Sequence, residues 1–277
     1  MLAYLGPAGT YSSQAAAKYL QTQKLRLESL PLRTIGEVID GVNSGAYKYG
    51  LVPIENMLEG GVDVTLDMLA RKKTRLFIIA EIDIAVKHKL IALPGVKLEE
   101  VREIFSHPQA LAQCQRYLRK KFPRAGVLSV SSTAEAVWKL RKENLRAAAA
   151  IGSLESAAKY GLKVLAGDIA DHRDNLTRFV VLAKELQIPR DKAVTSCVFS
   201  IRKDQPGGLY NILRFLAVAR INMTKIESRP SKAVMGDYIF FVDFDGTPAG
   251  KKAAKALQDM QNHCDFFKLL GVYQRSR

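Results

Sequence analysis

The sequence contains little cysteine, and its three cysteines are not arranged in pairs. Cys114, Cys197 and Cys264 lie far apart, and no CxxC spacing occurs. An odd number of scattered thiols argues against a disulfide framework and against a cysteine zinc site. Free thiols are typical of a reducing compartment, so we expect a cytoplasmic protein.

Histidine is equally scarce, with four residues in a chain of 277. His88, His107, His172 and His263 show neither HxxxH nor HExxH spacing, so the sequence predicts no metal site. A GxSxG nucleophile elbow is also absent, and none of the cysteines is placed as a nucleophile. The pattern therefore argues against zinc hydrolases and serine hydrolases of those types.

Long apolar runs are missing as well. The most apolar stretch, residues 76–86, is interrupted by Glu81 and Asp83, whereas a membrane helix needs about 20 apolar residues. The first five residues are mostly apolar but end at Gly6-Pro7, which predicts a short strand and not a secretory signal. We expect no membrane partner.

Positive charge is present in excess, with a formal net charge of +15. Residues 1–184 hold 27 basic and 18 acidic side chains, and the rest of the chain holds 15 and 9, so the excess is spread out. A nucleic-acid-binding protein usually concentrates Lys and Arg on one element with interleaved aromatics. We therefore expect no nucleic-acid partner, although a general positive field would attract a small dianionic substrate.

Strand-like and helix-like patterns alternate over the first two thirds of the chain. Apolar runs typical of strands occupy residues 2–5, 49–54, 76–86, 126–130, 147–151 and 177–183. Helical patterns occupy residues 12–20, 35–42, 64–70, 108–120, 133–141 and 154–160. Capping boxes mark two helix starts, Thr34 with Glu37 and Ser132 with Glu135. The alternation predicts an α/β fold with largely parallel sheets.

A second domain is predicted after a polar, proline-containing linker at residues 185–194. Its strand patterns occupy residues 195–201, 222–227, 238–244 and 266–272, and its helical patterns occupy residues 208–219 and 249–260. The order βαββαβ is that of a ferredoxin-like module. We therefore predict two domains, at residues 1–184 and 195–277.

Two segments near the start of the chain combine special backbone positions with polar side chains. The turn Gly6-Pro7-Ala8-Gly9-Thr10-Tyr11-Ser12 leads from a strand into a helix, where free N–H groups can bind an anion. A tight turn with a hydroxyl cap is the alternative interpretation. Val52-Pro53-Ile54-Glu55-Asn56 ends a strand in a carboxylate and an amide, where open α/β sheets bind ligands. The alternative here is a solvated loop.

Two later segments have the same character. In Ser106-His107-Pro108-Gln109, Ser106 can cap a helix that begins with Pro108, and Gln113 shares a face with Gln109. Asn175-Leu176-Thr177-Arg178-Phe179 places an arginine at the head of an apolar strand, and its guanidinium is suited to a carboxylate ligand. A surface arginine on an edge strand is the alternative. These residues alone predict an α/β protein that binds a small carboxylate ligand.

Taken together, these segments resemble the prephenate dehydratase family. In family order they are Gly6-Pro7-Ala8-Gly9-Thr10-Tyr11-Ser12, Val52-Pro53-Ile54-Glu55-Asn56, Thr65-Leu66-Asp67, Ser106-His107-Pro108-Gln109, Ser132-Thr133-Ala134 and Asn175-Leu176-Thr177-Arg178-Phe179. The second domain resembles an ACT module through Pro206-Gly207-Gly208-Leu209-Tyr210 and Glu227-Ser228-Arg229-Pro230. The resemblance covers nearly the whole chain, and both domains imply the same enzyme.

The resemblance implies a catalytic domain of two α/β lobes, similar to bacterial solute-binding proteins, with a cleft between them. The implied reaction removes water and carbon dioxide from prephenate to give phenylpyruvate, and needs no cofactor because the product becomes aromatic. The implied catalytic residues are Thr177, which donates a hydrogen bond to the departing hydroxyl, and Glu55, which orients it. The implied substrate-binding residues are Gly9, Thr10, Tyr11, Ser12, Asn56, Ser106, Gln113, Asn175, Arg178 and Phe179. Arg178 or the N–H groups of the Gly9–Ser12 turn would hold the carboxylate that survives.

The resemblance also implies regulation by an amino acid, with L-phenylalanine as the expected effector. It would bind between two ACT modules, so we expect the chain to self-associate as a dimer or a tetramer. The implied effector-binding residues are Gly207, Gly208, Leu209, Tyr210, Asn222, Glu227, Ser228, Arg229 and Pro230. Two positions depart from the family pattern, since Gly208 stands where alanine is usual and Met57 stands where a small hydroxyl residue is frequent.

Three alternatives remain open at this point. Arogenate dehydratase would perform the same chemistry on the amino-bearing analogue, and a carboxylate near the substrate ammonium would favour it. A non-catalytic protein that senses a ligand is the second alternative, against which the retention of Thr177 with Asn175 and Arg178 argues. Nucleic-acid binding is the third, and a steep salt dependence of DNA retention would support it.

Overall fold

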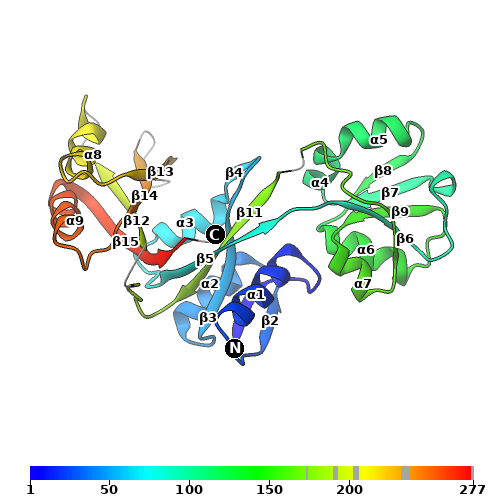
Figure 1. Ribbon diagram of the computed structural model, residues 1–277, viewed down its shortest axis with the longest axis horizontal. Coiled ribbons are helices and arrows are strands. Elements are labelled where there is room, and N and C mark those ends of the chain that lie inside the picture. The colour runs from blue at the N-terminus through cyan, green and yellow to red at the C-terminus, as the bar shows by residue number, and fades with distance from the viewer. Residues whose placement is uncertain (173, 190–192, 202–205, 232–236, 276–277) are drawn as a thin grey trace. The chain divides into compact units, whose positions relative to one another are not determined.

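The computed structural model describes residues 1–172, 174–189, 193–201, 206–231 and 237–275 (Figure 1). Contacts within the chain divide it into two compact units. The first comprises Met1–Val38, Leu51–Val62 and Asp83–Phe179, and the second comprises Ile39–Gly50, Asp63–Ile82 and Val180–Arg277. The predicted linker contains residues 190–192, which lie outside the described residues.

The strands follow the predicted alternation and add several short members to it. They are β1 (Leu2–Leu5), β2 (Ser29–Leu32), β3 (Tyr49–Asn56), β4 (Gly60–Gly61), β5 (Phe77–Ala85), β6 (Lys89–Ala92), β7 (Glu103–Ser106), β8 (Gly126–Ser129), β9 (Ala148–Gly152), β10 (Lys163–Ala166), β11 (Leu176–Ala183), β12 (Ala193–Ile201), β13 (Met223–Pro230), β14 (Tyr238–Asp245) and β15 (Cys264–Gln274). The unpredicted strands are β2, β6, β7 and β10, each four residues long, and β4, which has two residues.

The helices also lie close to their predicted positions. They are α1 (Tyr11–Thr22), α2 (Ile35–Ser44), α3 (Asp63–Ala70), α4 (Pro108–Gln113), α5 (Gln115–Lys121), α6 (Thr133–Lys142), α7 (Leu154–Lys159), α8 (Gly208–Val218) and α9 (Lys251–His263), with a short 3₁₀ turn, η1 (Leu98–Glu100). The helix predicted over residues 108–120 is two helices, because Cys114 leaves the helical conformation at φ −116° and ψ 14°. In the described part of the chain, no helix is long and apolar enough to cross a membrane.

In the first unit, one group of strands lies in the order β11, β3, β1, β2. Strands β1 and β2 are parallel, whereas β4 returns antiparallel on β3 through the pairs Glu55–Gly61 and Asn56–Gly60. Helix α1 begins at the Thr10 cap immediately after the turn that follows β1. The hydrogen bonds from Asn56 to Thr177 and from the N–H of Met57 to the backbone carbonyl oxygen of Leu176 bring the end of β3 beside the start of β11.

A five-stranded sheet forms the rest of the first unit, in the order β10, β6, β9, β7, β8. Its central strand β9 is buried along its whole length. Ala149 and Ile151 contribute to the core that includes α4 and α5, and Ala148 and Ala150 to the core that includes α6 and α7. Because successive residues of a strand face opposite sides, a strand covered on both faces is apolar throughout.

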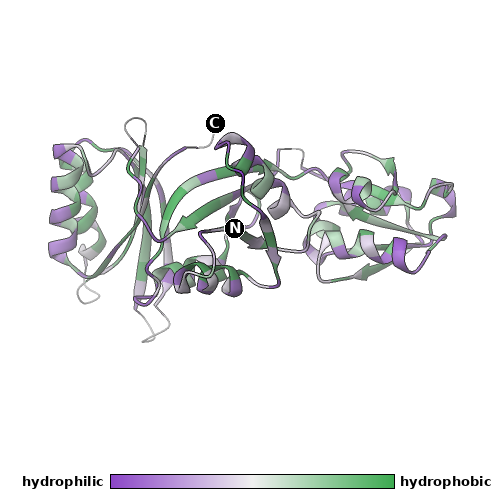
Figure 2. Ribbon diagram, turned by 90° about the horizontal axis from the view of Figure 1, so that it is seen from below, coloured by the Kyte–Doolittle hydropathy of each residue, from purple (hydrophilic) through white to green (hydrophobic). Residues whose placement is uncertain are grey.

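The sheets are mixed, which corrects the prediction that they are largely parallel. Strand β7 pairs parallel with both β8 and β9, whereas β6 pairs antiparallel with both β9 and β10. The short strands β6 and β10 lacked a signal of their own, and they supply the antiparallel edge. The α/β class itself is confirmed, and Figure 2 shows apolar strands beside helices that carry both apolar and polar residues.

The second unit contains an antiparallel sheet in the order β13, β14, β12, β15. One face packs on α8 and α9 in a core that includes Phe199, Leu216, Phe244 and Met260. This is the predicted βαββαβ module, and it extends through a contact between Gly271 of β15 and Ile78 of β5. A Cβ atom at Gly271 would lie 2.2 Å from the carbonyl oxygen of Ile78, so only glycine fits there.

Candidate active site

Thr177 and Asn56 form the hydrogen bond at the centre of the candidate site. The side-chain amide of Asn56 donates to Oγ1 of Thr177 over 2.8 Å. The carbonyl oxygen of that amide accepts from the backbone N–H of Leu58 over 3.0 Å, which fixes which end of the amide faces Thr177. Because Oγ1 acts as an acceptor toward Asn56, the hydroxyl hydrogen of Thr177 remains available for a different acceptor.

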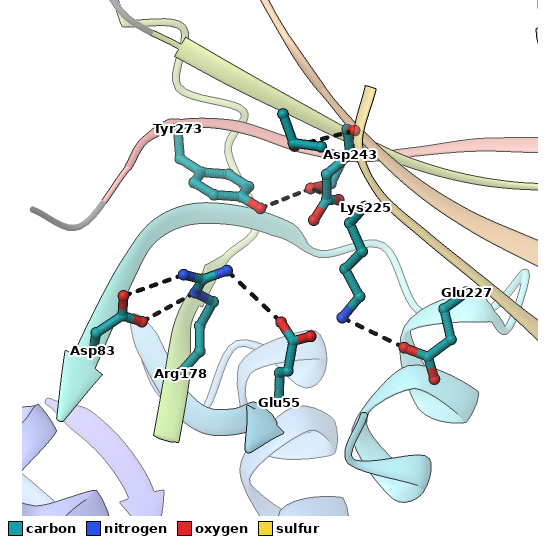
Figure 3. Close-up of polar contacts among 9 residues, drawn as sticks. Glu55, Asp83, Arg178, Lys225, Glu227, Asp243 and Tyr273 are labelled. Carbon is teal, nitrogen blue, oxygen red and sulfur yellow. Dashed lines mark hydrogen bonds and ion pairs between the residues drawn. The ribbon is translucent and has the colours of Figure 1, made fainter. Parts of the chain in front are cut away.

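Arg178 lies on the opposite face of β11 from Thr177, because adjacent strand residues alternate. Its Nε and Nη2 atoms donate to the two oxygens of Asp83 over 3.0 and 3.2 Å, and its Nη1 atom lies 3.7 Å from Oε2 of Glu55 (Figure 3). The forked face of the guanidinium is therefore occupied by Asp83. Glu55 was expected to orient Thr177, but the structure gives that contact to Asn56, which points to the other face of β3.

The turn before α1 is held by its own hydroxyl groups. Gly9 has φ +95°, a left-handed conformation that favours glycine, and its N–H donates to Oγ of Ser13 over 3.0 Å. Thr10 caps α1 by accepting from the N–H of Ser13. The N–H group of Gly9 is thus already engaged, and Ser12 is buried at 6% exposure. The predicted anion site would have to use the remaining donors.

The same turn contacts the five-stranded sheet within the first unit. Oγ of Ser153, the cap of α7, donates to the carbonyl oxygen of Gly9 over 3.0 Å. The hydroxyl of Tyr11 donates to the carbonyl oxygen of Lys87 over 3.1 Å, and burial raises the pKa of this phenol, so it remains protonated.

Gln113, at the end of α4, is the centre of a second hydrogen-bonded group. Its Oε1 atom lies 2.9 Å from Nε2 of His88 and accepts from Nδ2 of Asn175 over 3.2 Å. Its Nε2 atom lies 3.4 Å from Oε1 of Glu59. The aromatic ring of Tyr11 meets the ring of His88 edge to face, at 6.3 Å between centroids. Predicted residues Tyr11, Gln113 and Asn175 are therefore brought together by His88.

Ser106 and Phe179 are buried and serve local structure. Oγ of Ser106 donates to the carbonyl oxygen of Ile151 over 2.7 Å, and the side chain is fully buried. The cap of α4 is His107, whose Nδ1 accepts from the N–H of Gln109, so the sequence-based assignment of the cap to Ser106 was wrong by one residue. Phe179 is 2% exposed and belongs to the core. Ligand roles for Ser106 and Phe179 stay predictions.

Three residues of the site were missed from sequence, namely Glu59, Asp83 and His88. Asp83 interrupts an apolar run, and a charge in such a run is a usable signal for a buried partner. His88 and Glu59 carried no spacing signal. Among the described residues, no group of three or more His, Cys, Asp or Glu side chains could hold a metal ion.

The predicted effector residues lie in the second unit. Gly207 precedes α8 with φ +82°, and the amide of Asn222 donates to Asp245 over 3.0 Å. Leu209 is partly buried, Ser228 is exposed, and Tyr210 is 71% exposed. A Cβ atom at Gly208 would lie 3.1 Å from Cδ1 of Ile201. These positions surround the start of α8 and the strand β13, which carries residues 227–230.

The charged residues of β13 are paired. Glu227 lies 3.4 Å from Nζ of Lys225 (Figure 3). Arg229 is turned to α3, where Nη1 donates to Asp63 and Nε donates to Asp67 over 3.2 Å. The hydrogen bond to Asp63 is the main cause of a raised pKa of Arg229. Arg229 therefore links the predicted effector segment, which ends at Pro230, to a helix of the other predicted domain.

Comparison with known proteins identifies the family. The sequence model of a family described as "Prephenate dehydratase" matches residues 2–187, and one described as "ACT domain" matches residues 195–261. The chain belongs to the prephenate dehydratase family. It is 38% identical over 273 residues to a prephenate dehydratase of Methanocaldococcus jannaschii, covering 98% of this chain and 96% of that protein.

Other members of the family widen the comparison. The chain is 38% identical over 285 residues to the chloroplastic arogenate dehydratase/prephenate dehydratase 2 of Arabidopsis thaliana, covering 98% of this chain and 72% of that protein. The crystal structure of a prephenate dehydratase from Arthrobacter aurescens in complex with L-Phe matches with a TM-score of 0.90 and 33% identity, over 99% of this chain and 90% of that one. Both the enzyme family and the module that follows it are therefore as the sequence motifs predicted.

Proposed function

We propose that this enzyme converts prephenate to phenylpyruvate by loss of water and carbon dioxide, with Thr177 as the donor to the departing hydroxyl. The observation that carries the proposal is the hydrogen bond from Asn56 to Oγ1 of Thr177. It holds the side chain in place and leaves the hydroxyl hydrogen to be donated. Full-length relatives that are prephenate dehydratases support the same reaction.

The chemistry explains why a weak acid suffices at this position. Hydroxide is a poor leaving group, so it needs a proton or a strong hydrogen bond as the C–O bond breaks. Loss of carbon dioxide makes the ring aromatic, which supplies the driving force without a cofactor. Thr177 then acts mainly by hydrogen bonding and position, and Asn56 is the residue that positions it.

The two carboxylates of prephenate need different treatment. The ring carboxylate leaves as neutral carbon dioxide, so a strong ion pair would stabilise the ground state more than the transition state. The side-chain carboxylate survives and can be bound firmly. The candidate donors for it are the N–H groups of Thr10, Tyr11 and Ser12 and the guanidinium of Arg178, which also pairs with Asp83 and Glu55.

The ACT module supports regulation of the same enzyme by an amino acid. We propose L-phenylalanine as the effector, because a structurally similar prephenate dehydratase has been crystallised with it. It would bind between the ACT modules of two chains, at the start of α8 and along β13, so the regulated form is a dimer or a tetramer. Three free, buried cysteines are compatible with action in the cytoplasm, which we include in the proposal.

The reaction is tested by supplying prephenate and arogenate in parallel to the purified full-length chain. Phenylpyruvate is followed from the first and phenylalanine from the second, with Thr177→Ala as the control for non-enzymatic loss of water. We expect kcat/KM to be higher for prephenate. A preference for arogenate would assign the other substrate of the family, and no turnover of either compound would contradict the proposed function.

A further inference from the structure

His88 is a buried histidine that none of the steps above uses. It is 2% exposed and lies on the segment that joins β5 to β6. Asn175 lies on the segment that joins β10 to β11, and its backbone carbonyl oxygen accepts from the backbone N–H of Val86 over 2.8 Å. The two connections between the sheets of the first unit therefore run together at this point, and Gln113 lies between His88 and Asn175.

The hydrogen bonds among these three side chains allow only two concerted orientations. In the first, His88 Nε2–H and Asn175 Nδ2–H both donate to Oε1 of Gln113, and the Gln113 amide group donates to Glu59. In the second, all three groups are reversed, and the carbonyl oxygen of Gln113 faces the carboxylate of Glu59. Two acceptors facing each other repel, so the first orientation is favoured.

The protonation of His88 agrees with this orientation. Among the described residues, Nδ1 of His88 is buried without a hydrogen-bond partner, so a proton there would be a buried donor left unsatisfied. Burial is also the main cause of a lowered pKa of His88, which keeps the ring neutral. The ring therefore carries its single proton on Nε2, where Gln113 accepts it.

One consequence is that Oδ1 of Asn175, near Thr177, is left as a hydrogen-bond acceptor. With Nδ2 of Asn175 committed to Gln113, Oδ1 of Asn175 is buried and has no partner in the described part of the chain. Residues 175 and 177 are two apart at the start of a strand, so their side chains point to the same side. A buried acceptor without a donor is costly, and an O–H or N–H group of a bound substrate would satisfy it.

We propose that His88 is a positioning residue that orients the Gln113 amide and thereby presents Oδ1 of Asn175 to a donor group of the substrate. The proposal rests on the proposed function for the identity of the substrate. The orientation of the Gln113 amide by His88 does not depend on which substrate binds. His88 itself does not touch the reacting atoms.

His88→Gln and His88→Leu separate positioning from folding. Glutamine keeps an N–H donor near the place of Nε2, whereas leucine fills the space without a donor. We expect His88→Leu to raise KM by about tenfold with kcat within about twofold, because uniform binding is lost, and His88→Gln to restore most of the affinity. His263→Leu, at the exposed end of α9, is the matched control and should leave both constants unchanged.

A second measurement reads the orientation without substrate. Nitrogen-15 NMR of the unliganded full-length protein, assigned by comparison with His88→Gln, should show Nε2 protonated and Nδ1 bare. The Nδ1–H tautomer would overturn the proposal, as would His88→Leu with an unchanged KM. If the wild type turns over neither prephenate nor arogenate, the proposed function fails, and the tautomer still decides the orientation. A larger KM penalty for arogenate would identify the substrate ammonium, instead of the hydroxyl, as the donor.

Discussion

Asn56 and Thr177 lie 121 residues apart in the sequence and are joined by a hydrogen bond of 2.8 Å. The bond connects the end of β3 to the start of β11, which lie next to each other in the strand order. Since the Asn56 amide is itself fixed by Leu58, the threonine hydroxyl is held from one side and free on the other. This polarity of the pair is what makes Thr177 suitable as a donor.

Removal of the Thr177 hydroxyl tests its role directly. Thr177→Ala should lower kcat by about 10²-fold or more, because general acid–base assistance contributes typically that much, with little change in KM. Thr177→Ser keeps the hydroxyl and should retain part of the activity. Steady-state kinetics with prephenate measures both variants. A Thr177→Ala enzyme with a near wild-type kcat would contradict the role of Thr177 as donor to the departing hydroxyl.

Arg178 and Asp83 should behave as one unit toward the substrate. Arg178→Lys loses the bidentate fork, and Asp83→Asn removes its anionic partner, so each should raise KM several-fold with kcat nearly unchanged. The double variant should add little to either single one. Glu143→Gln breaks the exposed pair with Lys139 and serves as the control. If stability falls while KM stays constant, Arg178 is structural and the carboxylate site belongs to the Gly9–Ser12 turn.

The neutral His88 makes stability depend on pH in a definite direction. The pKa of His88 is lowered in the folded state. Below a pH of about 6.5, the ordinary pKa of histidine, His88 is therefore protonated in the unfolded chain but stays neutral in the folded chain. The stabilisation it gives is complete above that value and falls as the pH is lowered toward the folded-state pKa. Denaturant unfolding between pH 7.5 and pH 5 should show a steeper loss for wild type than for His88→Gln. Parallel curves would contradict a neutral buried ring.

Truncation after Lys184 tests the regulatory proposal. The fragment should turn over prephenate without responding to L-phenylalanine, since the ACT module is gone. It should also melt at a lower temperature, because Arg229 contacts Asp67 of α3 and Lys268 contacts the carbonyl oxygen of Leu69 of α3 in the full chain. Activity against added phenylalanine and calorimetry on both proteins measure this. An undiminished response in the fragment would show that the module is not the sensor.

Point variants refine the same prediction. Gly207→Val should weaken effector binding, because a β-branched residue is strained at φ +82°. Asp67→Asn removes one partner of Arg229 and should reduce inhibition while calorimetric binding of phenylalanine persists. Asp259→Asn, on the outer part of α9, is the control. Loss of binding in Asp67→Asn would place Arg229 at the effector instead of at the link to α3.

The sequence predicted element types better than pairings. Periodicity located the long strands and helices, and βαββαβ followed from order alone. The short strand β2 was missed because only part of its surface is covered, so no apolar run marks it. The pair between Arg178 and Asp83 spans 95 residues, and a contact of that range depends on how strands are ordered, which the local pattern does not contain. Glu55 and Asn56 were both proposed, but which of them faces Thr177 required the register of β3.

Helix α3 precedes the ACT module in the chain but depends on it for three of its polar contacts. Arg229 pairs with Asp63 and Asp67, and the ammonium group of Lys268 donates to the carbonyl oxygen of Leu69 in the helix. The same ammonium group donates to the carbonyl oxygens of Arg71 and Thr74, just after the helix. A chimera joined at the linker would remove Arg229 from both carboxylates and Lys268 from the carbonyl oxygens at and just after the end of α3. Exchange of regulatory modules between enzymes of this type therefore requires that the donor module carry basic residues equivalent to 229 and 268, or that α3 be transferred with it.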